Sequence, residues 1–126
     1  MNPLRASLGS IGSLAAALAL LAAPASAQSY TGPSSIAAGN SPAAIVAADL
    51  DADGDEDLVV CDAAFSTATV YENVNGTIQT SSVLSIVNNP VDLAAFDADG
   101  DGDLDLAFVG GNSSQLSVHL NDGAGN

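Results

Sequence analysis

An internal repeat with a period of 48 residues constrains this chain more than any other feature of its sequence. Shifted by 48 positions, residues 40–78 align without a gap to residues 88–126, with 13 identities in the 39 pairs. A period of this length is typical of proteins that stack one repeated supersecondary unit against its neighbours. The repeat predicts a first unit over residues 40–87 and a second over residues 88–126, which we expect to stop before its last strand.

Each unit is a series of short apolar runs rich in Val, Ile, Leu or Phe and bounded by Gly, Pro, Asn or Asp, which indicates strands. The expected strands are 43–48, 58–61, 68–71 and 77–87 in the first unit, and 91–96, 104–109 and 116–120 in the second. Hairpin turns are expected at 73–76 and 121–123, where Asn and Gly accept positive φ. We therefore predict an all-β fold of four-stranded antiparallel blades of a β-propeller.

Two repeats of this kind predict an incomplete propeller, because a closed ring needs about four to eight blades. Two explanations stay open. The chain is a fragment of a longer protein, or it is an open two-blade piece that must associate to cover its faces.

The first 27 residues have the layout of a secretory signal peptide. One cation, Arg5, precedes an apolar stretch from Leu14 to Ala23, and the small residues Ala25-Ser26-Ala27 follow. A membrane anchor is the competing interpretation, but the apolar stretch is shorter than the ~20 residues that cross a bilayer. We expect cleavage after Ala27, a secreted, cell-surface or periplasmic protein, and no membrane span in the mature chain. Residues 28–39 then lead into the first repeat, with a short strand expected at 34–38.

The charge of the chain is strongly acidic and unevenly placed. The formal net charge is −14, and loss of Arg5, the only Lys or Arg, brings it to −15. Such a protein is not expected to bind nucleic acid or anionic lipid, which need basic contacts. Eleven of the fifteen acidic residues lie in two loops, at 49–57 and 97–105.

Each loop places aspartate at positions one, three, five, seven and nine and glycine at position six (Gly54 and Gly102). Adjacent carboxylates at this spacing repel by about 1 kcal/mol per pair in water, so the folded loop needs a cation. Calcium suits oxygen ligands in flexible geometry, and the loops hold no His or Cys to favour zinc. The predicted metal residues are Asp49, Asp51, Asp53, Asp55, Asp57, Asp97, Asp99, Asp101, Asp103 and Asp105.

The opening Asp-x-Asp-x-Asp-Gly is shared with the EF-hand and dockerin loops. Position twelve of an EF-hand is an acidic ligand, whereas here it is Val60 or Phe108. Strand-like runs also flank these loops where an EF-hand has helices. An EF-hand or dockerin-like calcium module is therefore the weaker alternative.

The pattern Asp-x-Asp-x-Asp-Gly-x-x-Asp-Leu, followed by Val-Tyr-Glu-Asn at 70–73 or Val-His-Leu-Asn-Asp-Gly-Ala-Gly at 118–125, resembles the FG-GAP/VCBS repeat family. These are the calcium-binding blades of integrin-α-like propellers. The resemblance implies side-chain ligands at positions one, three, five and nine and a backbone carbonyl ligand at position seven. These are Asp49, Asp51, Asp53 and Asp57 with the carbonyl of Asp55, then Asp97, Asp99, Asp101 and Asp105 with that of Asp103. The Phe-Gly…Gly-Ala-Pro element is absent, so the sequence is nearer the VCBS variant.

The function that these features predict is a secreted, calcium-stabilised, non-catalytic module that presents its loops to a protein or glycan partner, as in cell adhesion. The alternative is the scaffold of a secreted hydrolase or lyase whose catalytic residues lie outside this chain. No catalytic residue is assigned, and His119 is interpreted as a surface or packing residue on a strand. Cys61, the only cysteine, is interpreted as a small buried apolar residue. Because each loop joins two strands of one unit, we expect calcium to be structural.

Overall fold

The computed structural model describes residues 35–112 and 114–125, so the predicted signal peptide lies outside the described residues. Their secondary structure consists of strands, and they contain no helix that could cross a membrane. The seven strands are β1 (Pro42–Ala48), β2 (Asp57–Asp62), β3 (Thr67–Val74), β4 (Thr77–Ser85), β5 (Pro90–Phe96), β6 (Asp105–Gly110) and β7 (Leu116–His119).

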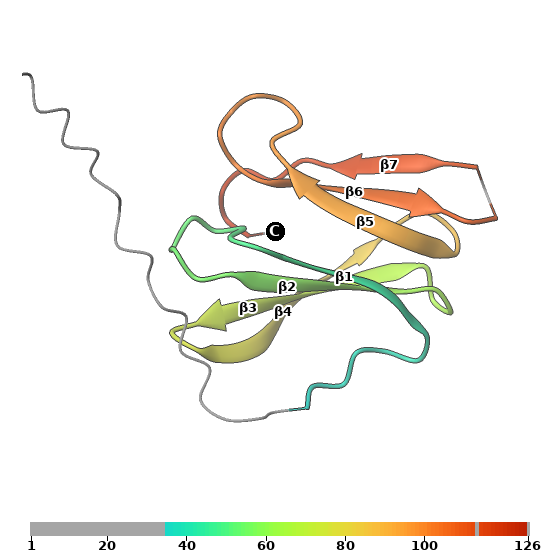
Figure 1. The fold of residues 1–126 in the computed structure, drawn as a ribbon, viewed down its shortest axis with the longest axis horizontal. Helices are drawn as coiled ribbons and strands as arrows, with labels where there is room; N and C mark the ends of the chain where they lie inside the picture. Colours follow the sequence, from blue (N-terminus) through green and yellow to red (C-terminus); the bar gives the residue numbers. More distant parts are fainter. Residues whose placement is uncertain (1–34, 113, 126) are drawn as a thin grey trace, which may run out of the picture.

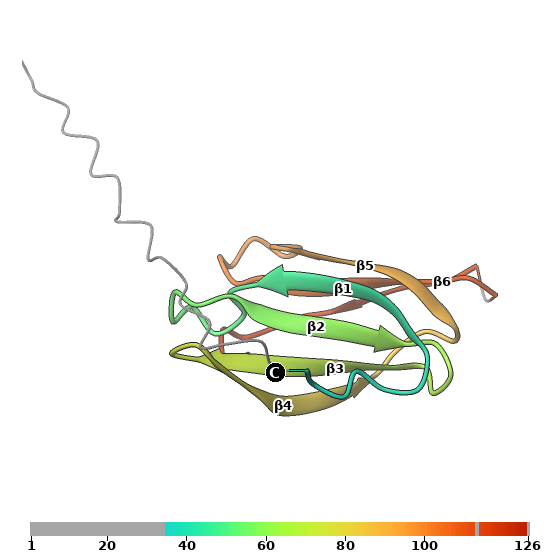
Figure 2. The ribbon, with the colours of Figure 1, turned by 60° about the horizontal axis from the view of Figure 1, so that its bottom comes forward.

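The strands form two antiparallel sheets, which follow the chain order. The first sheet has the order β1-β2-β3-β4 and the second has the order β5-β6-β7 (Figure 1). In Figure 2 the two sheets lie one against the other as layers, with β1 beside β5. The predicted all-β class is thus confirmed, and each predicted strand from 43 onward is found within a few residues of its expected bounds.

The sequence repeat is also a repeat of strand geometry. The bounds of β5 and β6 are those of β1 and β2 displaced by 48 residues. The register agrees too, since Ala48 pairs with Asp57 and Phe96 pairs with Asp105. Even the irregularity after Pro42 recurs after Pro90. The two sheets are therefore versions of one structural unit.

The segment before β1 differs from the expectation. Residues 35–38 were predicted to belong to a strand at 34–38, and they are not in a strand. Instead, the Ala37 carbonyl accepts a hydrogen bond of 2.7 Å from the Tyr71 hydroxyl. A side chain of β3, rather than a neighbouring strand, satisfies this backbone group.

The hydrophobic core lies between the sheets. Alternate residues of the first sheet point toward the second, among them Val59, Cys61 and Val70, and they meet Leu106 and Phe108 of the second sheet. Phe108 and Cys61 are fully buried, which confirms the predicted role of the cysteine. His119 packs edge-on against Phe108, with ring centroids 5.3 Å apart, so the histidine is a packing residue. We call the faces that meet in this core the inner faces and the opposite ones the outer faces.

Candidate metal sites in the acidic loops

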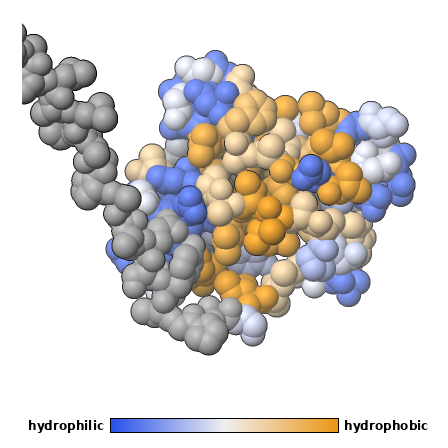
Figure 3. Space-filling model, in the orientation of Figure 1, coloured by the Kyte–Doolittle hydropathy of each residue, from blue (hydrophilic) through white to orange (hydrophobic). Residues whose placement is uncertain are grey.

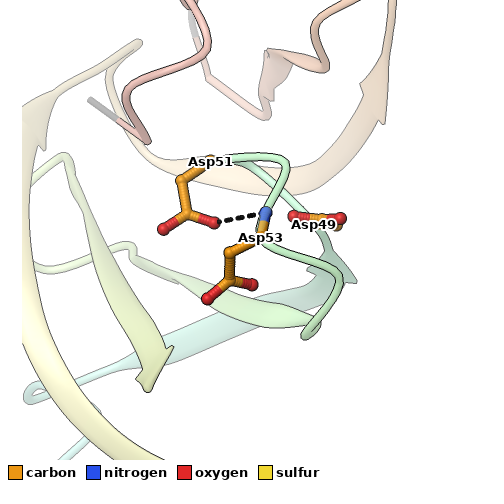
Figure 4. Close-up of side chains that lie close together, drawn as sticks. All are labelled: Asp49, Asp51 and Asp53. Carbon is orange, nitrogen blue, oxygen red and sulfur yellow. Dashed lines mark hydrogen bonds between the residues drawn. The ribbon is translucent and has the colours of Figure 1, made fainter. Parts of the chain in front are cut away.

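The two acidic loops join β1 to β2 and β5 to β6. In the first loop, Asp49, Asp51 and Asp53 each place a carboxylate oxygen within 4.8 Å of the others (Figure 4). In the second loop, Asp97, Asp99 and Asp105 do the same. Three carboxylate oxygens at this separation could hold a metal ion, and a hard cation such as Ca²⁺ takes further oxygen ligands from backbone carbonyls and water.

Short-range hydrogen bonds give both loops the same shape. Asp51 Oδ1 accepts from the Asp53 amide at 3.2 Å, and Asp99 Oδ1 accepts from the Asp101 amide at the same distance. The first aspartate of each loop reaches across it, with Asp49 Oδ2 accepting from Gly54 N and Asp97 Oδ2 from Gly102 N, both at 3.1 Å. The acidic side chains thus hold the backbone in a tight curl.

Two positions in each loop have left-handed backbone conformation. The predicted glycines at position six, Gly54 and Gly102, have φ of 96° and 103°. Position four is also left-handed, with Gly100 at 87° and Ala52 at 60°. Alanine accepts this region at a cost, so the first loop is the more strained of the two. The sequence did not indicate the second left-handed position, because only one loop has glycine there.

The ninth aspartate of each loop is buried and is held by the backbone. Asp57 accepts from Leu50 N at 3.1 Å and from Asn73 N at 2.8 Å. Asp105 accepts from Ala98 N at 2.7 Å and from Asn121 N at 2.8 Å. Each ninth aspartate therefore ties its own loop to the end of the third strand.

The two ninth aspartates differ in their ionisation and in their neighbours. Hydrogen bonds from Asn121 and Ala98 hold the pKa of Asp105 below its ordinary value. Burial raises the pKa of Asp57 in spite of its two hydrogen bonds. The structure brings Asp105 into the acidic group of its loop, whereas Asp57 stands outside the group formed by Asp49, Asp51 and Asp53.

The other predicted metal residues lie around these groups. Asp55 Oδ2 accepts from the amide of Asn75, in the hairpin turn that follows β3, at 3.2 Å. The corresponding Asp103 lies against Gly123, where a Cβ would approach its carboxylate to 2.7 Å. Asp101 accepts from the Asp103 amide at 3.0 Å and lies outside the group of its loop.

One carboxylate oxygen in the first loop is buried without a partner. Asp49 Oδ1 receives no hydrogen bond, although the corresponding Asp97 Oδ1 accepts from Gly100 N at 2.6 Å. A buried oxygen of this kind is costly unless something positive meets it. The sequence has no Lys or Arg beyond Arg5, so a solvent cation is the natural partner. The oxygen-only donor set and this orphan oxygen both fit calcium.

Asn121 is a residue of the site that sequence reasoning missed. Its side-chain amide donates to the Leu104 carbonyl at 3.2 Å, and the corresponding Asn73 donates to the Glu56 carbonyl at 3.2 Å. Each asparagine side chain thus binds a backbone carbonyl in the acidic loop of its own sheet. The signal was present in the repeat, because Asn73 and Asn121 are one of its identical pairs.

The fold and the loops together define a class of protein. It is an all-β repeat protein in which antiparallel sheets carry matching acidic loops between their first two strands. Residues 49–108 match the model of the FG-GAP-like repeat family. Neither the curated proteins nor the solved structures gave a significant match.

Proposed function

We propose that this chain is a secreted, non-catalytic interaction module of the β-propeller type, with one structural calcium ion in each acidic loop. The observation that carries the calcium assignment is the buried, unpartnered Asp49 Oδ1 among three converging carboxylates. The match of residues 49–108 to the FG-GAP-like repeat family supports the propeller-type role. The two sheets would then be successive blades.

A structural role for the ion follows from where the loops are attached. Each loop links the first two strands of its sheet, and its ninth aspartate accepts a hydrogen bond from Asn73 near the end of β3 or from Asn121 just after β7. Neutralising the carboxylates would remove their mutual repulsion and hold three strand ends together. Ion binding energy would then be folding energy.

We propose a role in binding rather than in catalysis, because the histidine and the buried aspartates of the described residues have structural contacts. The only histidine packs against Phe108, and the ninth aspartates accept backbone hydrogen bonds. An extracellular protein or a glycan is the proposed partner of the exposed loops. Secretion is proposed on the leader sequence alone, and mass spectrometry of the exported protein should place its first residue at Gln28.

Isothermal titration of the chelator-treated full chain with Ca²⁺ tests the metal sites. We expect two sites in the wild type and one in each of Asp49→Asn and Asp97→Asn. Asp92→Asn is the matched control, because it removes one exposed carboxylate outside the loops. Two sites surviving in both loop variants, or Mg²⁺ binding as tightly as Ca²⁺, would contradict the assignment.

A further inference from the structure

Both outer faces carry exposed apolar side chains. On the second sheet, Phe96 is 45% exposed, Leu116 65% and Val118 44%. On the first sheet, Ile45 is 63% exposed. Figure 3 looks onto the side of the molecule where β1 and β5 meet, and it shows hydrophobic residues across the middle with hydrophilic residues at the margins. Exposed apolar side chains gathered on the face of a sheet are typical of an interface.

The repeat relates these free faces to the internal interface between the sheets. A shift of 48 residues carries the inner face of the first sheet onto the outer face of the second, and the outer face of the first onto the inner face of the second. The inner face of the first sheet corresponds, residue by residue, to the outer face of the second: Ala48 to Phe96, Val59 to Ala107, Cys61 to Val109, Ala68 to Leu116 and Val70 to Val118. The outer face of the first sheet corresponds to the inner face of the second: Ile45 to Leu93, Ala47 to Ala95, Leu58 to Leu106 and Val60 to Phe108.

The internal interface is therefore heterologous, since it joins two different surfaces of one repeated unit. Each outer face of the chain resembles one of these two surfaces. Consider a second copy that packs on this chain with the geometry of the internal interface. The outer face of the first sheet in that copy would then lie on the outer face of the second sheet in this chain. The two faces left free on one chain are thus the two halves of one interface.

The sizes of the side chains compensate across this arrangement. In the internal interface, the large Phe108 of one surface meets a surface that contains the small residues Ala48 and Ala68. The sizes are reversed at the equivalent positions of the outer faces. Val60 of the first sheet is equivalent to Phe108, and Phe96 and Leu116 of the second sheet are equivalent to Ala48 and Ala68. The outer face of the first sheet, where Val60 replaces the larger Phe108, also has a hollow of about 270 Å³. The residues that line it include Ala38, Pro42, Ile45 and Val60. A bulkier surface therefore faces a more recessed one.

We propose that this chain associates head to tail with a second copy of itself, the outer face of the first sheet receiving the outer face of the second. Self-association would cover both faces at once, because each outer face resembles the partner surface of the other. The segment before β1 lies over part of this face, where the Ala37 carbonyl accepts a hydrogen bond from Tyr71 and Ala38 lines the hollow, but Ile45 stays 63% exposed. The net charge of −14 opposes the contact, so the association strengthens as salt screens it.

Sedimentation velocity of the full chain, over a concentration series in calcium and in chelator, tests this proposal. Wild type should form dimers and larger species, because a heterologous contact leaves one face free at each end. Ile45→Gln and Leu116→Gln should each weaken the association by about tenfold or more. An equimolar mixture of the two variants should recover a dimer and stop there, since each copy retains one competent face.

Phe65→Gln is the matched control. Phe65 is 68% exposed in the turn between β2 and β3 and belongs to neither face, so its loss should leave the association unchanged. Circular dichroism checks that each variant keeps the β fold. A monomer at every concentration in both buffers would overturn the proposal and leave the faces to another protein. So would a mixture that behaves as the separate variants do, which would indicate an isologous contact. Calcium binding by titration is independent of either result.

Discussion

The side-chain amide of Asn121 donates a hydrogen bond of 2.6 Å to the backbone carbonyl of Leu50, 71 residues earlier in the chain. The same amide donates to Leu104 O in its own sheet, and its backbone N–H donates to Asp105. One buried residue after the second sheet therefore holds both acidic loops. Gly125 extends the contact, because a Cβ there would lie 3.3 Å from that of Asp51.

Asn121→Ala should destabilise the fold by about 2 kcal/mol, because it leaves two buried carbonyls with one donor fewer. Asn73→Ala is the control, since Asn73 bonds only within the first sheet, to Glu56 O and Gly76 N. Urea unfolding gives both free energies. Hydrogen exchange should show faster exchange of the second sheet in Asn121→Ala alone. Equal exchange in the two variants would mean that the bond to Leu50 does not join the sheets.

Gly54→Ala should cost about 1 kcal/mol, because alanine is disfavoured at positive φ. A Cβ at Gly54 meets nothing within 4 Å, so steric contact adds nothing to this value. Ala52→Gly is the reciprocal change and should be neutral or stabilising by up to about 1 kcal/mol. Urea midpoints in chelator measure both effects. A neutral Gly54→Ala would show that the loop reshapes without penalty.

Asp62 should make the stability of the first sheet depend on pH. Hydrogen bonds from the amides of Asn40 and Ala64 lower the pKa of its carboxyl below the ordinary value of 3.8. A carboxyl whose pKa is lower in the folded state stabilises the fold above the unfolded value, and this stabilisation is lost as the pH falls through the folded value.

Asp62→Asn should consequently be less stable than the wild type at pH 7, and the difference should shrink as the pH falls below 3.8. Thermal unfolding at several pH values in chelator measures this difference. A gap between the two proteins that stays constant down to low pH would contradict the role assigned to the carboxylate.

Cys61 should resist thiol reagents in the folded protein. Burial raises the pKa of its thiol to about 11, so little thiolate is present and its sulfur is inaccessible. Labelling at pH 8 should be slow in the native chain and fast in urea. The proposed calcium sites add a second expectation, that a chelator also speeds labelling. Rapid labelling of the native chain in calcium buffer would contradict the packed core.

The strand order and the acidic loops were predictable from the sequence, because both depend on local patterns. Runs of β-branched and aliphatic residues between Gly, Pro, Asn and Asp specify strands within about three residues, and alternating aspartates with Gly54 or Gly102 specify a curled anionic loop. The repeat predicted two copies of one unit, and the structure adds that the β1–β2 and β5–β6 pairs have the same register.

Only the tertiary structure decided which oxygen atoms converge and which are already engaged. Asp57 and Asp105 occupy the same position in the pattern, yet only Asp105 joins the acidic group of its loop. The bond from Asn121 to Leu50 depends on how the second sheet is placed on the first, and no local pattern encodes a contact between residues 71 positions apart. Periodicity along the chain determines the repeated unit, whereas packing between units determines the surroundings of each carboxylate.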